Sequence, residues 1–172
     1  MKSFSESENT EMQWVQPEAL SRYHELRSGQ DVYATLRWVQ VFGSLAESAS
    51  AEGEFTLKRG GFLKRHVTMR DAQTGNDLAV LHIGMFRQGT LEFMNGRRID
   101  LISTRFWSFQ WDFVDENGMT LCTVRMVPTL GKRSGEVIIS NLVRRDRDLL
   151  VMLIAGWYSM VVIRQEAAAA SS

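Results

Sequence analysis

The residues with the clearest potential for chemistry lie in one basic stretch, LKRGGFLKRHVTMR, at positions 57–70. It contains no acidic residue, and its five cations are Lys58, Arg59, Lys64, Arg65 and Arg70. Two glycines and Phe62 separate the cationic pairs, a composition typical of a tight hairpin with an apolar tip. Paired cations beside an apolar tip can bind the phosphate of a lipid headgroup. The stretch therefore predicts an anion or lipid-headgroup site at Lys58, Arg59, Lys64 and Arg65.

The same stretch has a second interpretation, as a solvated hairpin without a ligand. Glu47, Glu52 and Glu54 precede it and supply carboxylates that would neutralise its cations. Exposed ion pairs of this kind are common and contribute about 0–1 kcal/mol each. The composition of the stretch favours this second interpretation, and the lipid-headgroup site stands beside it as the alternative.

Residue types that serve in catalysis are present, but their spacing does not favour an active site. His24, His66 and His82 are far apart, and none belongs to a His-x-x-x-His or Cys-paired arrangement. Cys122 is the only cysteine; as a nucleophile it would need a histidine base nearby, so we expect a buried structural role. We therefore expect no catalytic residue, no metal site and no cofactor.

Three carboxylates, Asp112, Asp115 and Glu116, lie around an Asp-Glu-Asn-Gly turn. The turn accounts for the residue types at these positions, because Asp and Asn hydrogen-bond to their own backbone there. Glycine-rich phosphate loops and the nucleophile-elbow motif are absent from the sequence. These observations predict a protein that is not an enzyme.

The charge balance restricts the class of partner. Twenty Lys and Arg residues match twenty Asp and Glu residues, so no net charge attracts the chain to nucleic acid. The N-terminal sequence lacks the apolar region of a secretory signal, and a single cysteine fits a reducing compartment. We expect a cytoplasmic protein, peripheral to a membrane if it has an anionic lipid partner. No protein partner is predicted from the sequence.

Short alternating segments separated by turn residues dominate the chain. The strongest hairpin signal is Asn95-Gly96, because both residues tolerate a positive φ angle. In the segment 106–114, four aromatic residues share one face of the expected strand: Trp107, Phe109, Trp111 and Phe113. Alternation in the segment 120–127 places Cys122 on the inward face. We count about ten to twelve strands, and an antiparallel sheet of that size must curl or close.

One long helix is predicted near the end of the chain. Residues 149–163 are fifteen uncharged residues, with Asp146 or Asp148 placed to cap the N-terminus and Arg164 beyond the other end. Fifteen residues span about 22 Å, which is short for a bilayer core of about 30 Å. The length favours a buried core helix over a membrane span, which stays the alternative.

These elements predict one mainly β architecture: a closed antiparallel barrel of about twelve strands around a central apolar C-terminal helix. A barrel of that size is too wide for its own side chains to fill, so the helix fills it. We expect a disordered or loosely docked tail at 1–13, a single domain at 14–166 and a disordered tail at 167–172.

Three segments carry a resemblance to a known family: 36–62 (LRWVQVFGSLAESASAEGEFTLKRGGF), 94–101 (MNGRRIDL) and the apolar run 149–163. They resemble the tubby C-terminal-like superfamily, which includes phospholipid scramblases and LURP-one-related plant proteins, and are most similar to a bacterial branch of uncharacterised proteins. The resemblance covers about residues 23–164. It implies a twelve-stranded barrel around a central helix and, for some relatives, binding of lipids, especially phosphoinositides. No lipid-binding residue of the family can be assigned to a position of this sequence.

The sequence thus predicts a non-catalytic tubby-like barrel that binds a lipid headgroup or another anion through its basic hairpin. Two alternatives remain open. One is a scaffold or protein-interaction barrel without a small ligand, and the other is a scramblase-like protein whose last helix is inserted in a membrane.

Overall fold

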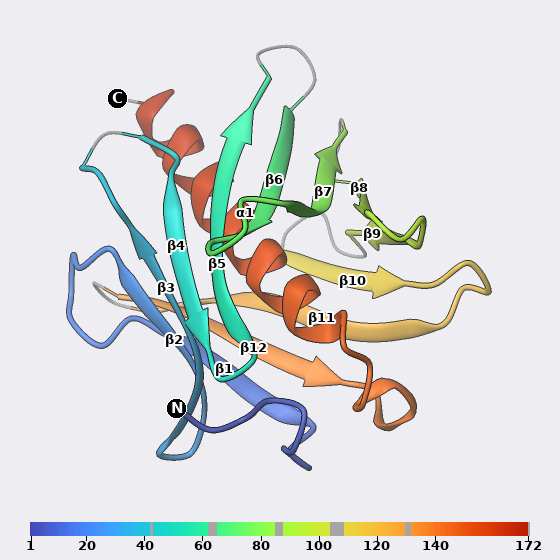
Figure 1. The fold of residues 1–172 in the computed structure, drawn as a ribbon. Helices are drawn as coiled ribbons and strands as arrows, with labels where there is room; N and C mark the ends of the chain where they lie inside the picture. Colours follow the sequence, from blue (N-terminus) through green and yellow to red (C-terminus); the bar gives the residue numbers. More distant parts are fainter. Residues whose placement is uncertain (42, 62–64, 85–87, 104–108, 130–131, 172) are drawn as a thin grey trace.

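The computed structural model describes residues 1–41, 43–61, 65–84, 88–103, 109–129 and 132–171. The described chain folds into a closed antiparallel barrel of twelve strands with helix α1 (Leu149–Ala169) running through it (Figure 1). This confirms the predicted fold class. The strands are β1 (Glu11–Val15), β2 (Tyr23–Ser28), β3 (Asp31–Trp38), β4 (Ala46–Ser50), β5 (Gly53–Gly60), β6 (Arg65–Asp71), β7 (Asp77–Ile83), β8 (Gly89–Phe93), β9 (Arg98–Ile102), β10 (Gln110–Val114), β11 (Thr120–Pro128) and β12 (Arg133–Ile139).

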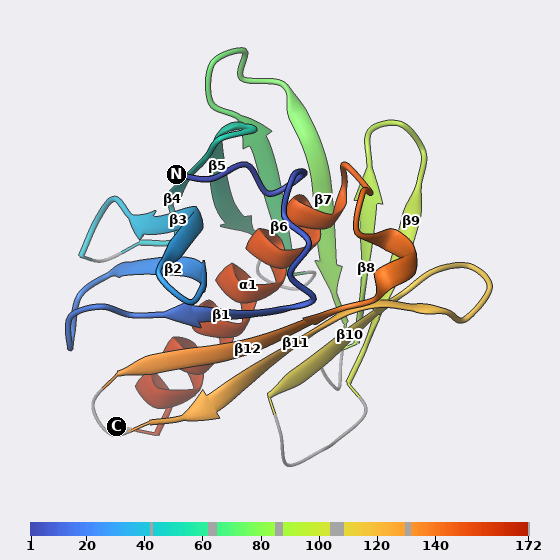
Figure 2. The same ribbon diagram turned by 90° about the horizontal axis from the view of Figure 1, so that it is seen from below.

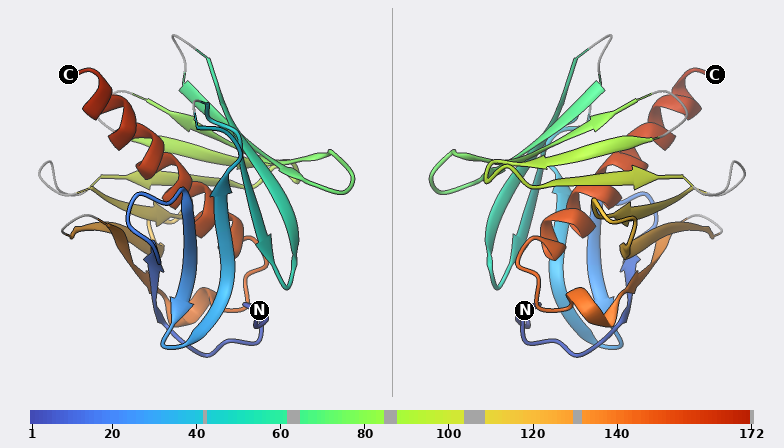
Figure 3. Two further views of the ribbon diagram at one scale, coloured as in Figure 1. Left: turned by 90° about the vertical axis from the view of Figure 1, so that its left-hand side faces the viewer. Right: turned by 90° about the vertical axis from the view of Figure 1, so that its right-hand side faces the viewer.

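Each strand pairs with the next one in sequence, and β12 returns to pair with β1, which closes the barrel. Because the strands alternate in direction, the connections alternate between two ends of the barrel. We call the end where α1 finishes the exit end, and the end where it begins the entry end. The two chain termini lie at opposite ends (Figure 3). The odd-numbered strands therefore lead to connections at the exit end, and the even-numbered strands up to β10 lead to connections at the entry end.

The inward faces of the strands follow the predicted alternation. Phe55 and Leu57 of β5 are buried, as are Trp111 and Phe113 of β10, although β10 also buries Asp112 on its other face. Cys122 is also buried, as expected. Phe109 is half-buried against the core, while Trp107 lies outside the described residues. The hairpin at Asn95-Gly96 joins β8 to β9, with Gly96 at a φ of 89°.

Helix α1 is surrounded by the barrel wall (Figure 2). Its residues 149–162 are all buried, and 78% of its most apolar 18-residue stretch is buried. Its 21 residues are long and apolar enough to cross a membrane, but their burial is that of a core helix. The Trp157 indole stacks on Trp14 of β1 with ring centroids 6.0 Å apart, and it lies against Gly135 of β12. The barrel is therefore filled by the helix, as predicted.

The start of α1 is fixed by ion pairs rather than by a side-chain cap. Asp148 is the N-cap residue, but its side chain makes no capping hydrogen bond. Instead, Arg97 of the β8–β9 turn donates to Asp146 at 2.9 Å and to Asp148 at 2.8 Å. The Asp146 carboxylate also accepts from the Asp148 N–H at 2.9 Å. The single arginine thus joins the helix entry to the barrel wall.

The N-terminal segment, predicted as a tail, makes specific contacts in the structure. Strand β1 begins at Glu11, inside the range 1–13 assigned to the tail. The Phe4 side chain is only 4% exposed, and the Glu52 carboxylate accepts from the N–H groups of Phe4 at 2.6 Å and Ser5 at 3.0 Å. A buried aromatic anchor and a local acceptor explain why this polar segment docks. At the other terminus, α1 continues past residue 166 to Ala169.

Candidate functional site

The predicted basic hairpin lies at the exit end, but its cations do not form one cluster. Lys58 and Arg59 are consecutive residues of β5, so their side chains point to opposite faces of the strand. Arg65 begins β6, and Lys64 lies outside the described residues. Arg59 and Arg65 lie on the same face of their strands as the buried residues, which is the inward face. Lys58 lies on the outward face and is exposed. The structure therefore brings Arg59 and Arg65 together and separates Lys58 from them.

A carboxylate from the far end of the sequence neutralises these arginines. Arg59 forms an ion pair with Glu166 of α1, and the Arg65 Nη1 lies 3.9 Å from the same carboxylate. The carboxylates named from the sequence are engaged elsewhere: Glu47 pairs with Arg37 at 2.7 Å, and Glu52 holds the N-terminal segment. The expectation that these two neutralise the hairpin is therefore wrong: Glu47 lies opposite Thr56 of β5 but pairs with Arg37, and Glu52 lies in the β4–β5 turn at the entry end.

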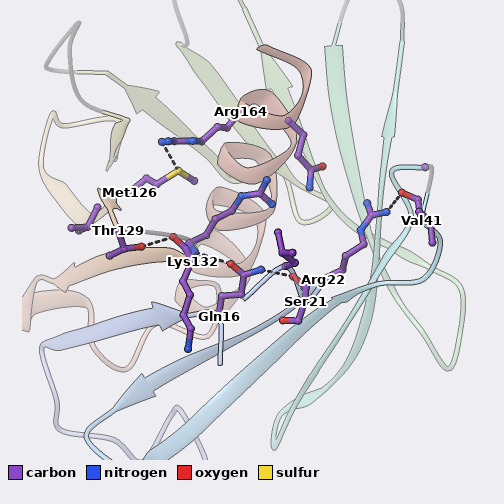
Figure 4. Close-up of a pocket in the computed structure, with 13 residues that line it drawn as sticks. Gln16, Ser21, Arg22, Val41, Met126, Thr129, Lys132 and Arg164 are labelled. Atoms are coloured by element: carbon purple, nitrogen blue, oxygen red, sulfur yellow. Dashed lines mark hydrogen bonds between the residues drawn. The ribbon is translucent and has the colours of Figure 1, made fainter. Parts of the chain in front are cut away.

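A larger cationic site opens beside the end of α1 (Figure 4). It is a cavity of about 650 Å³ formed by the β1–β2 and β3–β4 connections, the β11–β12 end and the last turns of α1. Four cations line it, and no acidic residue is among its described lining residues: the cations are Arg22, Lys132, Arg133 and Arg164. We call this cavity the rim pocket.

The inward-facing rows of the strands explain why cations gather there. Along β2 the inward positions are Leu26 and His24, and Arg22 is the next position on that row. Along β12 the inward position Gly135 is followed at the rim by Arg133. Each row is uncharged where it faces α1 and becomes cationic where the barrel opens. These cations were not identified from the sequence. The recognisable pattern is an arginine two residues beyond the last buried inward position of a strand.

Hydrogen bonds to main-chain carbonyls fix two of the cations. The Arg22 guanidinium donates to the carbonyl oxygens of Gln40 and Val41, tying the β1–β2 and β3–β4 connections together. Lys132 Nζ donates to the carbonyl oxygen of Pro17 at 2.7 Å. Carbonyl oxygens carry only partial negative charge, so both side chains keep their full positive charge at the pocket.

Arg164 has a sulfur atom and an aromatic ring as neighbours, and the backbone of Arg133 is held by Gln16. Arg164 Nη1 lies 3.6 Å from the sulfur of Met126, and its guanidinium lies 5.9 Å from the centre of the Phe109 ring. The Arg133 N–H donates to Gln16 Oε1 at 2.7 Å, which fixes the backbone at the start of β12. Gln16 itself is only 6% exposed and forms the polar floor of the pocket.

The rim pocket has an excess of positive charge. Burial, and then repulsion from Arg164 and Arg22, lowers the pKa of Arg133. In the described part of the chain, no carboxylate oxygen lies within 4 Å of any of the four cations. Neighbouring cations without counter-ions bind anions readily, because an anion relieves their mutual repulsion.

Beneath the pocket lies an aromatic layer that contains His24. The imidazole is fully buried, with ring centroids 5.6 Å from both Trp38 and Trp157. Burial, and then repulsion from Arg133, lowers the pKa of His24 to about 4. The histidine is therefore neutral near pH 7, and the positive charge of the site comes from the arginines and Lys132.

Two exposed apolar side chains flank the cations. Leu20 is 92% exposed and Val41 is 74% exposed, and both line the rim pocket. Leu20 also has a φ of 64°, the only positive φ of a residue other than glycine in the described chain. That conformation costs about 1–2 kcal/mol for a residue with a Cβ. The β1–β2 connection thus holds a leucine out in solvent next to four cations, despite the backbone strain.

Within the described residues, no group of three His, Cys, Asp or Glu side chains is placed to hold a metal ion. Burial raises the pKa of the Cys122 thiol above its ordinary value, which disfavours the reactive thiolate. No family model, curated protein or solved structure matches this chain. We therefore assign the rim pocket as the candidate functional site from its geometry and charge alone.

Proposed function

We propose that this protein is a non-catalytic barrel that binds phosphate groups of an anionic membrane surface at its exit end. The observation that carries the proposal is the rim pocket, which four cations line and whose described wall contains no carboxylate. The ligand class is the one predicted from the sequence, but the proposed contacts are Arg22, Lys132, Arg133 and Arg164. The proposed location is cytoplasmic and peripheral to the membrane.

The exposed Leu20 and Val41 favour a lipid surface over a soluble anion. Apolar side chains beside a cationic pocket can enter the headgroup region while the cations contact phosphates. Both side chains lie at the exit end, beside the four cations of the rim pocket. The entry end has polar turns at 28–31 and 72–76, and it exposes single apolar side chains at Met94 and Leu142. Within the described residues, only the exit end combines exposed apolar side chains with a cationic pocket.

The expected affinity is modest. Each cation close to an anionic bilayer contributes about 1 kcal/mol, so four contribute about 4 kcal/mol. Full burial of Leu20 and Val41 would add about 1.5–3 kcal/mol each. Association costs at least about 4 kcal/mol in lost freedom. The balance corresponds to reversible binding that weakens as salt screens the cations.

Co-sedimentation with phosphatidylcholine vesicles, with and without phosphatidylserine, tests the proposal. We expect the wild-type protein to bind only the anionic vesicles, and the Arg133→Gln/Arg164→Gln double variant to lose that binding. Arg70→Gln is the control, because Arg70 is an exposed arginine near the entry end that pairs with Asp77. A double variant that binds as well as wild type would overturn the assignment of the site. Binding equal to both kinds of vesicle would overturn the role of charge.

A further inference from the structure

A second cationic pair at the exit end is occupied by the protein's own carboxylate. Arg59 and Arg65 both reach Glu166, from opposite strands of the β5–β6 hairpin. Glu166 is the only acidic residue of α1. It lies near the C-terminus of the helix, where the helix dipole disfavours negative charge. The two arginines therefore stabilise a carboxylate that the helix itself would disfavour.

The three side chains are partly exposed at the rim of the barrel, although the Glu166 Oε1 atom that pairs with Arg59 is itself buried. The side chains of Arg59, Arg65 and Glu166 are 29%, 51% and 32% exposed. Ion pairs exposed to this degree are screened by water and salt, so a competing anion can replace the carboxylate. The fold does not depend on the pair, because Tyr158 joins α1 to the same wall. Its hydroxyl accepts from the Arg59 N–H at 3.1 Å and donates to the carbonyl oxygen of Ser44.

We propose that Glu166 is an internal counter-ion that masks a second anion-binding site formed by Arg59 and Arg65, and that lipid phosphates displace it. The inference rests on the proposed function, since the second site is at the same end as the rim pocket. The rim pocket is open and makes the first contact. The second site becomes available only when the surface carries enough negative charge to compete with Glu166. Binding should therefore rise steeply with the anionic lipid content.

The variant Glu166→Gln removes the mask and leaves both arginines in place. Loss of one negative charge at an anionic surface should tighten binding about fivefold at low salt. The matched control is Glu92→Gln, which also removes one acid from an ion pair, since Glu92 pairs with Arg98 at 3.2 Å on the outer wall. Neutralising Arg59 and Arg65 in the Glu166→Gln background should remove the gain. Far-UV circular dichroism checks that each variant is folded.

The outcomes separate this inference from the proposed function. If Glu166→Gln binds no more tightly than Glu92→Gln while the rim-pocket double variant loses binding, the second site is wrong and the rim pocket stands. If Glu166→Gln gains and the double variant binds normally, the second site stands and the rim pocket is wrong. If no variant binds anionic vesicles, both are overturned. Binding of soluble tripolyphosphate without vesicle binding would overturn the lipid surface as the ligand of either site.

Discussion

The substitution Gly135→Ala tests the packing of α1 against the barrel wall. A Cβ at this position would lie 2.4 Å from Cζ3, 2.9 Å from Cε3 and 3.0 Å from Cη2 of Trp157. Ordinary carbon contacts are about 3.5–4.0 Å, so the indole would have to move by about 1 Å. Its movement is restricted, because it is fully buried between α1 and the wall, with the Trp14 ring 6.0 Å and the His24 ring 5.6 Å away.

Overpacking of this kind costs about 1–3 kcal/mol, while replacing a strand glycine by alanine returns about 0.5–1 kcal/mol. We therefore expect a net loss of about 1–2 kcal/mol in the free energy of unfolding. Urea unfolding followed by far-UV circular dichroism measures it. Ser134→Ala, one position away and on the opposite face of β12, should stay within about 0.5 kcal/mol of wild type.

A double-mutant cycle sharpens the test. Trp157→Phe alone should destabilise the protein by leaving a cavity, but in the Gly135→Ala background the smaller ring makes room for the new methyl group. The two losses should therefore be less than additive. Gly135→Ala with wild-type stability, or strictly additive losses, would refute the position of the helix inside the barrel.

Two further predictions concern stability. His24 has a folded-state pKa of about 4 against 6.5 in the unfolded chain, so the unfolded state takes up the proton first as the pH falls. The free energy of unfolding should therefore fall by roughly 3 kcal/mol between about pH 6.5 and pH 4. Urea titrations at several pH values measure this fall, and it should be smaller in His24→Leu. An equal fall in the variant would refute the role of His24. Arg97→Gln should lower stability by about 1 kcal/mol in low salt, because it leaves Asp146 and Asp148 without their cation, and the difference should shrink in high salt. A salt-independent loss would instead indicate a packing role.

The fold follows from local patterns that the sequence carries openly. Apolar and polar residues alternate along β5, and Asn95-Gly96 forms a tight turn. Both features depend on neighbouring residues, so they can be recognised without the structure. The uncharged run of α1 has apolar side chains on every side, so a soluble fold must surround it to bury them. Barrel closure follows from the number of strands.

The candidate site was only partly predictable. The alternation of β5 already implies that Lys58 and Arg59 diverge, and the prediction overlooked it. The rim pocket combines Arg22, Arg133 and Arg164 from three distant segments, so only the order of strands around the barrel brings them together. The predicted anion chemistry remains the proposal, now at a different place on the same end.

A fluorescent probe at each end of the barrel reports which end meets the membrane. An environment-sensitive label on Leu20→Cys reports the exit end, and the same label on Asn117→Cys reports the exposed β10–β11 turn at the entry end. The buried Cys122 is protected from labelling. With vesicles containing phosphatidylserine, we expect a blue shift for the label at position 20 and none at position 117. A shift at position 117 alone, or equal shifts at both positions, would contradict the orientation proposed for this barrel.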